Sequence, residues 1–328
     1  MAPTPKRTQT EHIVLPLADD ETLEELYLAQ TKTRTHFLQV SKGPADLVAR
    51  SLDLGQVQLF EAQGDGHHLW HDEMLAQEWR IAVMADAGAT TKVGPVELTP
   101  SHVSVMRPGE TTSLLTNGPY QTLEINVPDA TAYDLGWPQR GELFEASAGQ
   151  VEALISSAHA ALSTFAQRSG RRNNFATVPW ATILLDQITD LFETSCIDGP
   201  SKTATNGAYA QSDIVRRAFA KLRDVDYAKS ATIDGLCADL AVSRRSLFLA
   251  FQKQLGLGPR RLNELVRLHF LRARLFRAAP ETTSVANEAE QAGFADFGRL
   301  SGIYRDVFGE LPRDTLRTVH QEFGALAR

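Results

Sequence analysis

The chain has 328 residues, a formal net charge of −7 and 43% hydrophobic residues, which predicts about two globular domains. No apolar run approaches the roughly 18 residues of a membrane-spanning helix, so a membrane protein is excluded. Cys196 and Cys237 are the only cysteines, which excludes a disulfide framework. The first twelve residues lack the apolar core of a secretory signal, and we therefore expect a protein of the reducing cytoplasm.

The charge is unevenly distributed along the chain. Residues 1–208 contain 14 Lys and Arg against 26 Asp and Glu, a net charge of −12. Residues 209–328 contain 19 against 14, a net charge of +5. A basic C-terminal third on an acidic body indicates that only that third meets a polyanion such as nucleic acid.

The first half of the chain is typical of a β-rich domain. Between residues 34 and 127, short runs rich in β-branched and aromatic residues are separated by Gly, Pro and Asn turns. Many short strands without a βαβ alternation predict a sandwich or a small barrel. A short helix is expected first, at about 20–31, and the expected strands are 36–40, 57–60, 79–84, 103–106 and 122–127.

The hydrophobic period changes to three or four residues between 148 and 197, which predicts two amphipathic helices joined near residues 170–179. Their apolar stripes could pack on the sheet domain, on a second copy of the chain, or on both. A stretch rich in Gly, Pro, Ser and Thr follows and predicts a linker. The expected organisation is an N-terminal domain at 1–147, a helical pair at 148–197 that dimerises, a linker at 198–210 and an all-α domain at 211–328.

An internal repeat marks the C-terminal third. Six residues recur after 53 positions: Ser243, Leu247, Phe251, Leu255, Gly256 and Pro259 match Asp296, Leu300, Tyr304, Phe308, Gly309 and Pro312. Just upstream the offset is 52: Cys237, Ala241 and Val242 match Ala289, Gly293 and Phe294.

Each copy of the repeat predicts two helices joined by a tight turn. The small residues Cys237 and Ala289 allow close helix approach, and Ser243 and Asp296 are of the type that caps a helix N-terminus. The hydrophobic residues four apart would bury the second helix, and the Gly and Pro after it end one helix and begin another. The product is a helix–turn–helix, made twice, with a longer helix between the copies.

The second helix of each unit is expected to enter the major groove of DNA. Arginine can read guanine, glutamine can read adenine, and apolar side chains can contact thymine methyl groups. Lys253, Arg260, Arg261, Arg267, Arg313 and Arg317 are expected to contact phosphate or to be surface charges. The residues expected to face DNA are Arg244, Arg245, Phe248, Leu249, Gln252 and Lys253 in the first copy, and Arg299, Gly302, Ile303 and Arg305 in the second.

The double unit resembles the AraC/XylS family of bacterial transcription regulators over residues 211–320, most specifically over residues 293–317 and with most similarity to the XylS branch. Leu300 stands where that branch has Phe, Arg313 where it has Ser, and Leu249 where the family often has a polar side chain. The resemblance implies an activator with two recognition helices (about 243–255 and 296–308) in successive major grooves of a direct repeat. It also implies RNA polymerase as a partner, a homodimer, and a cupin-like N-terminal sandwich that binds a small organic effector.

Two groups in the N-terminal domain are candidate ligand sites. Trp70, Trp79, Arg80 and Arg107 could line an effector pocket, with an aromatic wall and a cation for a carboxylate. His67, His68, His71, Asp72 and Glu73 form a polar cluster that we predict to be a loop or the rim of a pocket, with a cupin-type metal site as the alternative.

Two further functions stay open at this point. The chain could be a cupin-type metalloenzyme with a DNA-binding tail, or a regulator without any effector. No phosphate-binding glycine loop, nucleophile–histidine–acid motif or paired catalytic carboxylates stand out, so neither an enzyme nor a cofactor is expected.

Overall fold

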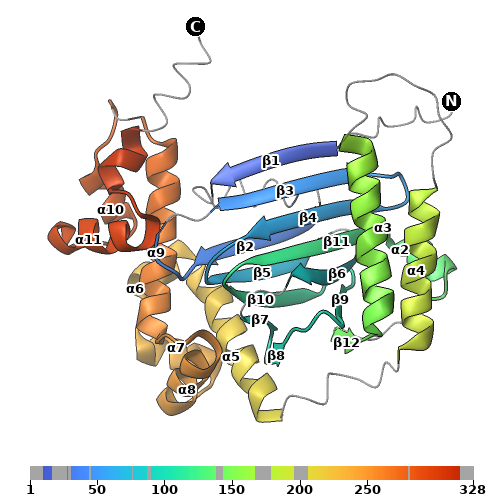
Figure 1. Ribbon diagram of the computed structural model, residues 1–328. Coiled ribbons are helices and arrows are strands. Elements are labelled where there is room, and N and C mark those ends of the chain that lie inside the picture. Colours follow the sequence, from blue (N-terminus) through green and yellow to red (C-terminus); the bar gives the residue numbers. More distant parts are fainter. Residues whose placement is uncertain are drawn as a thin grey trace, which may run out of the picture.

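The computed structural model describes residues 10–16, 28, 31–43, 46–75, 77–86, 90–137, 143–166, 179–195, 206–279 and 281–317. Two antiparallel sheets packed face to face form the N-terminal part, and helices form the C-terminal part (Figure 1). The expected α+β class, with an N-terminal β-sandwich and an all-α C-terminal region, is confirmed.

The larger sheet has seven strands, and the smaller sheet has five. The larger one runs, in spatial order, β1 (Thr10–Pro16), β3 (Asp46–Asp53), β4 (Gln58–Gly64), β11 (Tyr120–Pro128), β6 (Glu78–Asp86), β9 (His102–Met106) and β12 (Leu143–Glu145). The smaller one runs β2 (Thr33–Gln39), β5 (His68–Met74), β10 (Thr111–Asn117), β7 (Thr90–Val93) and β8 (Val96–Glu97).

The central strands of the larger sheet are buried on both faces, and the two faces differ in chemistry. In β11, Leu123 and Ile125 point away from the smaller sheet and join an apolar core with the helices. Glu124, between them, points into the space between the sheets, because successive side chains of a strand alternate. The same alternation in β6 separates Ile81 from Arg80.

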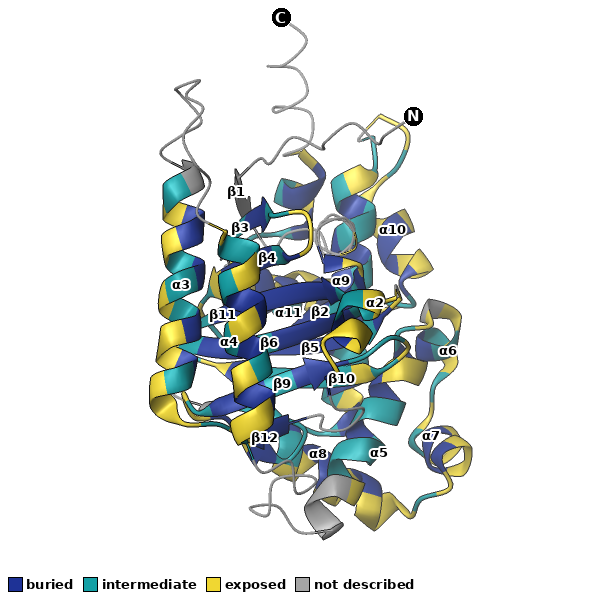
Figure 2. Ribbon diagram, turned by 90° about the vertical axis from the view of Figure 1, so that its right-hand side faces the viewer, coloured by how far each residue is buried: buried dark blue, intermediate teal, exposed yellow. Residues whose placement is uncertain are grey.

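The outer face of the larger sheet is covered by α2 (Asp129–Asp134), α3 (Ala148–Ala166) and α4 (Trp180–Thr194). Leu154 and Ile188 in the predicted apolar stripes are fully buried in this core. Figure 2 shows the buried inner sides of α3 and α4 against the sheet and their exposed outer sides. The two predicted helices therefore exist, and their apolar stripes pack within one chain.

Seven helices form the described C-terminal region: α5 (Asn206–Leu222), α6 (Val225–Ser230), α7 (Ile233–Leu240), α8 (Arg244–Leu255), α9 (Pro259–Arg277), α10 (Val285–Gln291) and α11 (Phe297–Phe308). Residues 206–210, which we assigned to the linker, are helical, because Asn206 and Gly207 occupy the first turn and helix-compatible residues follow. The rest of that linker and most of the helix expected at 20–31 lie outside the described residues. None of the described helices combines the length and apolarity that crossing a bilayer requires.

The helical region is docked on the smaller sheet (Figure 1). Leu38 of β2 and Leu69 of β5 are buried in the same apolar cluster as the core of the helical region. The backbone N–H of Gln39, in the edge strand β2, donates to Nε2 of His269 on α9 at 3.0 Å. The Gln39 side-chain amide donates to the carbonyl oxygen of Val307 on α11 at 2.9 Å.

Candidate nucleic-acid interface

The repeat folds into two helix–turn–helix units, α7–α8 and α10–α11, which lie toward opposite ends of α9 (Figure 1). The second helix of each unit begins at the predicted N-cap. The Ser243 side chain accepts a hydrogen bond from the N–H of Ser246, and the Asp296 carboxylate accepts one from the N–H of Arg299. Such caps satisfy backbone donors that the helix itself leaves unpaired.

The turns within the two units adopt left-handed backbone at equivalent positions. Ala241 has φ of +55°, and Gly293 has φ of +78°. A Cβ at position 293 would lie 2.8 Å from Cγ of Lys229. Glycine is therefore required in the second unit by a close approach as well as by its backbone conformation.

The predicted anchors bury the inner side of each second helix. Leu247 and Phe251 of α8 and Leu300 and Tyr304 of α11 are at most 1% exposed. The Tyr304 hydroxyl also lies 2.8 Å from Oγ1 of Thr315. Both helices are therefore held firmly by one side, and the opposite side is free for a partner.

The outward side of α8 carries every residue predicted for the first copy. Arg244, Arg245, Gln252 and Lys253 are exposed. Phe248 and Leu249 are 44% and 43% exposed, which is unusual for large apolar side chains. Arg244 donates to Asp234 of α7 at 2.5 Å, and this bond lowers the pKa of the Asp234 carboxyl.

The outward side of α11 carries three of its four predicted residues. Arg299 is 73% exposed and 3.8 Å from Glu264 of α9, and Arg305 is also exposed. Gly302 is exposed, and a Cβ there would meet open space. Ile303, which we expected on this surface, is half-buried and packs on the apolar core, because its position on the helix lies at the edge of the anchor stripe.

A hollow of about 760 Å³ lies between α9 and the N-terminal end of α11, lined in part by Arg260, Arg261 and Arg299. Arg267 also lines it but has a structural role. Its Nε donates to the carbonyl oxygen of Ala292 at 2.9 Å, and its guanidinium lies 4.3 Å from the centre of the Phe294 ring. We expected a phosphate contact or surface charge at Arg267. The structure shows instead that Arg267 holds the turn between α10 and α11.

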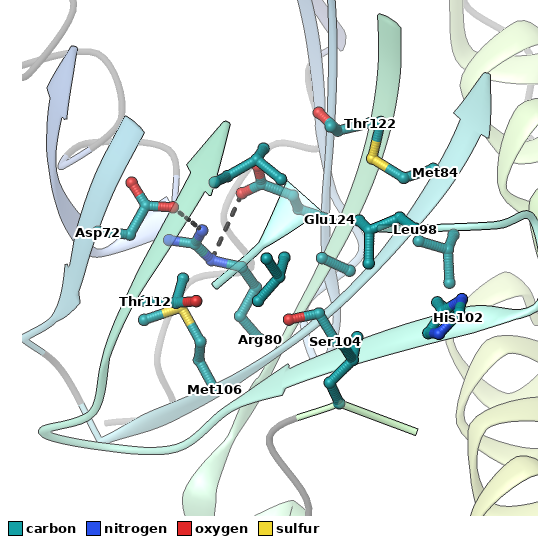
Figure 3. Close-up of a pocket in the computed structure, with 15 residues that line it drawn as sticks. Asp72, Arg80, Met84, Leu98, His102, Ser104, Met106, Thr112, Thr122 and Glu124 are labelled. Atoms are coloured by element: carbon teal, nitrogen blue, oxygen red, sulfur yellow. Dashed lines mark hydrogen bonds and ion pairs between the residues drawn. The ribbon is translucent and has the colours of Figure 1, made fainter. Parts of the chain in front are cut away.

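A second candidate site lies between the sheets, where the sandwich encloses a cavity of about 50 Å³ (Figure 3). Arg80 occupies it with two carboxylates. Its Nη1 is 2.7 Å from Oδ2 of Asp72, and its Nε is 3.5 Å from Oε2 of Glu124. Burial raises the pKa of Glu124 to about 7, with the Asp72 charge acting in the same direction and Arg80 opposing it.

Of the four residues predicted for the effector pocket, only Arg80 lines this cavity. Trp79 points to the opposite face of β6, where its Nε1 donates to Oδ1 of Asp129 at 2.7 Å. Trp70 is packed beside Phe37 and Tyr120 in the sandwich core. Arg107 lies in the β9–β10 turn and donates to Glu110 at 2.8 Å. The structure therefore does not bring the four together.

Sequence reasoning missed Glu124 and assigned Asp72 to the polar cluster. A signal for Glu124 was present: Thr122, Glu124 and Asn126 alternate with apolar residues on one strand. A strand in the middle of a sandwich has no solvated face, so its polar alternate residues must line an internal site.

Four of the five residues of the histidine cluster lie on a strand and not in a loop, and His67 immediately precedes that strand. Residues 68–74 form strand β5, because their side chains are buried on both sides. His68 packs beside Phe37, Trp70 and Tyr120, which belong to the sandwich core, whereas His71 faces Phe219 of α5. Burial lowers the pKa of both, that of His68 to about 3. Within the described residues, no three His, Cys, Asp or Glu side chains are placed to share a metal ion.

Comparisons with known proteins concentrate on the repeat. The family model described as "Helix-turn-helix domain" matches residues 236–318. The "Probable thc operon regulatory protein" of Rhodococcus erythropolis is 38% identical over 88 residues, which is 27% of this chain and 26% of that protein. "XylDLEGF operon transcriptional activator 3" of Pseudomonas putida is 37% identical over 89 residues, 27% of each chain. The match thus spans about a quarter of the length of these curated relatives.

Solved structures similar to the chain include the AraC-like transcriptional activator CuxR. That similarity covers 86% of this chain and all of CuxR, with 14% sequence identity and a TM-score of 0.37. A cupin 2 conserved barrel domain protein from Rhodopseudomonas palustris matches 47% of this chain and 89% of its own, with 10% identity and a TM-score of 0.23.

Proposed function

We propose, from the premise that residues 236–318 are an AraC-type helix–turn–helix domain, that this chain is a sequence-specific DNA-binding regulator of transcription. One observation carries the proposal: two capped helices, α8 and α11, are each anchored on one side and bear an exposed, largely basic surface on the other.

The length of α9 supports a target with two half-sites. Its 19 residues span about 28 Å at the rise of an α-helix. One turn of B-DNA is about 34 Å, and α9 carries one recognition helix toward each of its ends. The two helices would therefore enter successive major grooves on one side of the duplex, and the target would be a direct repeat.

We assign different roles to the exposed side chains. Arg245 and Arg299 are the candidates for reading guanine, and Gln252 for reading adenine. Phe248 and Leu249 offer apolar contacts to thymine methyl groups. Lys253 and Arg305 are assigned to phosphate, which fixes position without reading sequence, and Arg244 must leave Asp234 before it can contact DNA.

Binding to the DNA upstream of its own gene tests this function. Fluorescence anisotropy would compare that fragment with a shuffled one over a range of salt concentrations. We expect preference for the upstream fragment and an affinity that falls steeply with salt, since phosphate contacts release counterions. Equal affinity for both fragments, or a flat salt response, would reject the proposal.

Arg299→Ala tests base reading at a single residue. If Arg299 reads a base, the variant loses about 1–3 kcal/mol of specific binding and relaxes its preference at one position. Lys253→Ala, a phosphate candidate, should weaken binding to both fragments alike and lower the salt slope by about one. Arg107→Ala removes the same charge from the sandwich and should leave both quantities unchanged.

The remaining partners are proposed on less direct grounds. We also propose that the chain acts as an activator, contacts RNA polymerase and works in the cytoplasm. We also propose a homodimer; if it forms through α3 and α4 it uses their outward sides, since their apolar stripes pack within the chain. The inter-sheet cavity is the site we assign to a small effector. No observation favours an enzymatic role over this one.

A further inference from the structure

The cavity between the sheets has the character of a small ligand site. Its volume is about 50 Å³, and a water-sized sphere needs roughly 10–15 Å³, so about three to five non-hydrogen atoms fit. Apolar side chains, including Met84, Met106 and Leu98, form much of its wall. The charged groups that enter it come from β5, β6 and β11 (Figure 3).

The positive charge in this cavity is already engaged. The Arg80 guanidinium contacts Asp72, Glu124 and the hydroxyl of Thr33, which leaves little of it to pair with a ligand carboxylate. The Arg80 side chain is only 4% exposed. From the sequence we expected an arginine that is available to bind the carboxylate of an effector, and the structure corrects this expectation.

The negative charge is in excess. Asp72 and Glu124 together carry two carboxylates against one guanidinium, and both residues are less than 10% exposed. Oδ1 of Asp72 and Oε2 of Glu124 are buried and accept no hydrogen bond from any described residue. Buried carboxylate oxygens without donors are costly, and a ligand that supplies N–H groups would remove that cost.

The third titratable group in the wall, His102, does not restore the balance. Its Nδ1 accepts a hydrogen bond from the N–H of Thr99 at 3.0 Å, which places the ring proton on Nε2. Burial lowers the pKa of His102, so the ring is neutral near pH 7. His102 therefore adds no positive charge to balance the two carboxyl groups.

We propose that this cavity binds a small organic cation, of the amidinium or alkylammonium class, whose N–H groups donate to Asp72 and Glu124. Planar N–H groups match carboxylate oxygens in the way that a guanidinium does, and charged hydrogen bonds of this kind are the strong ones. The role of such a cation as the effector rests on the proposed function. Its binding does not, and can be measured without DNA.

Three isosteres of four non-hydrogen atoms separate charge from size: acetamidinium, acetamide and acetate. Methylammonium adds a smaller cation. Calorimetric titration and thermal shift of the full chain at pH 8, with ionic strength held constant, would compare them. We expect the two cations to bind and raise the melting temperature, acetamide to bind more weakly and acetate not to bind. Binding of acetate as tight as that of acetamidinium, or no binding of either cation, would overturn the proposal.

Glu124→Gln keeps the shape of the side chain and removes its charge. We expect it to lower the affinity for acetamidinium by about tenfold or more, since a charged hydrogen bond becomes a neutral one. Glu73→Gln is the matched control, because Glu73 neighbours Asp72 on β5 but points to the other face of the strand and pairs with Arg34. Equal loss in both variants would contradict the assignment.

The affinity of the Glu124→Gln variant for DNA is the second measurement, and it reports whether the variant is folded. If Glu124→Gln retains the affinity of the wild-type chain for the upstream fragment, the variant is folded and its loss of cation binding is specific. If Glu124→Gln fails to fold, Asp72→Asn replaces it with the same expectation. Failure of cation binding in a wild-type chain that binds DNA would reject the ligand and leave the regulator intact.

Discussion

Glu124 lies in an environment that a carboxylate does not prefer. It is 6% exposed, in the middle of a strand, and its nearest charged neighbours are Arg80 and Asp72. A carboxylate in such a place is stabilised only in part by one guanidinium at 3.5 Å. The raised pKa of about 7 is the measurable consequence.

This shift predicts how stability depends on pH. The folded-state pKa of Glu124 is about 7 and the unfolded value is 4.5, so between these pH values the folded chain holds a proton that the unfolded chain releases. Glu124 therefore makes the folded state less stable as the pH rises from 4.5 to 7, by about 3 kcal/mol in total. Arg80 and Asp72 are the charged groups that face it.

Glu124→Gln removes this titration. Urea unfolding of wild type and variant at pH 5, 6, 7 and 8 should show that the variant gains stability relative to wild type as the pH rises to 7, after which the difference levels off. A difference that does not change with pH would show that Glu124 titrates at its ordinary value.

The alternation of side chains between the two faces of a strand was enough to predict part of this site. Trp79 and Arg80 are adjacent on a strand, so they had to lie on opposite faces and could not share a pocket. That Arg80 would be engaged by Asp72 could not be foreseen, because the pair depends on β5 of one sheet lying over β6 of the other.

The sequence signals that specify the two helix–turn–helix units are local. The cap at Ser243, the turn at Ala241 and the stop at Gly256 each depend on neighbours within one turn. For this reason the repeat predicted both units and their boundaries closely, and the resemblance to AraC-type regulators is confirmed for this region.

The strands were predicted less completely, since β5 is polar at buried positions such as His68, His71 and Asp72, and β10 is polar at the buried Thr116. His71 is covered by Phe219 of α5, and Asp72 by Arg80 of the larger sheet. None of these is a neighbour in sequence, and a polar segment is ordinarily interpreted as a loop.

The turn positions 241 and 293 predict unequal responses to exchanges between Gly and Ala. Gly293→Ala should cost about 1–3 kcal/mol, since it adds a left-handed alanine and a Cβ only 2.8 Å from Lys229. Ala241→Gly relieves the left-handed strain at φ of +55° and should change stability by less than about 1 kcal/mol in either direction. Urea unfolding of both variants measures this. Equal effects of the two would contradict the close approach at Gly293.

On the scale of the whole molecule, the sandwich and the DNA-binding helices share an apolar cluster. Leu38 and Leu69 of the smaller sheet are 2% and 3% exposed within it. Gln39 adds two hydrogen bonds to partners 230 and 268 residues away, at His269 and Val307. Contacts of such sequence separation leave no local signal, and sequence analysis predicted two domains without predicting how they meet.

Leu69→Ala tests whether this shared apolar cluster couples the unfolding of the sandwich to that of the C-terminal helices. The lost packing should cost about 2–5 kcal/mol, and we expect one calorimetric unfolding transition of the wild type to separate into two. Lys42→Ala is the control, since the Lys42–Asp306 ion pair at 3.2 Å is exposed and contributes little. Unchanged cooperativity in Leu69→Ala would show that the parts are coupled elsewhere.

The alternation along β6 and β11 has a consequence for how this protein can diverge. Ile81 and Ile125 keep the helices on the sheet, whereas Arg80 and Glu124, one residue away, decide the charge of the cavity. If the inter-sheet cavity is the effector site proposed above, mutations at the even positions would change which molecule it binds while the scaffold stays intact. A directed-evolution library for ligand choice would then need to vary only one face of two strands.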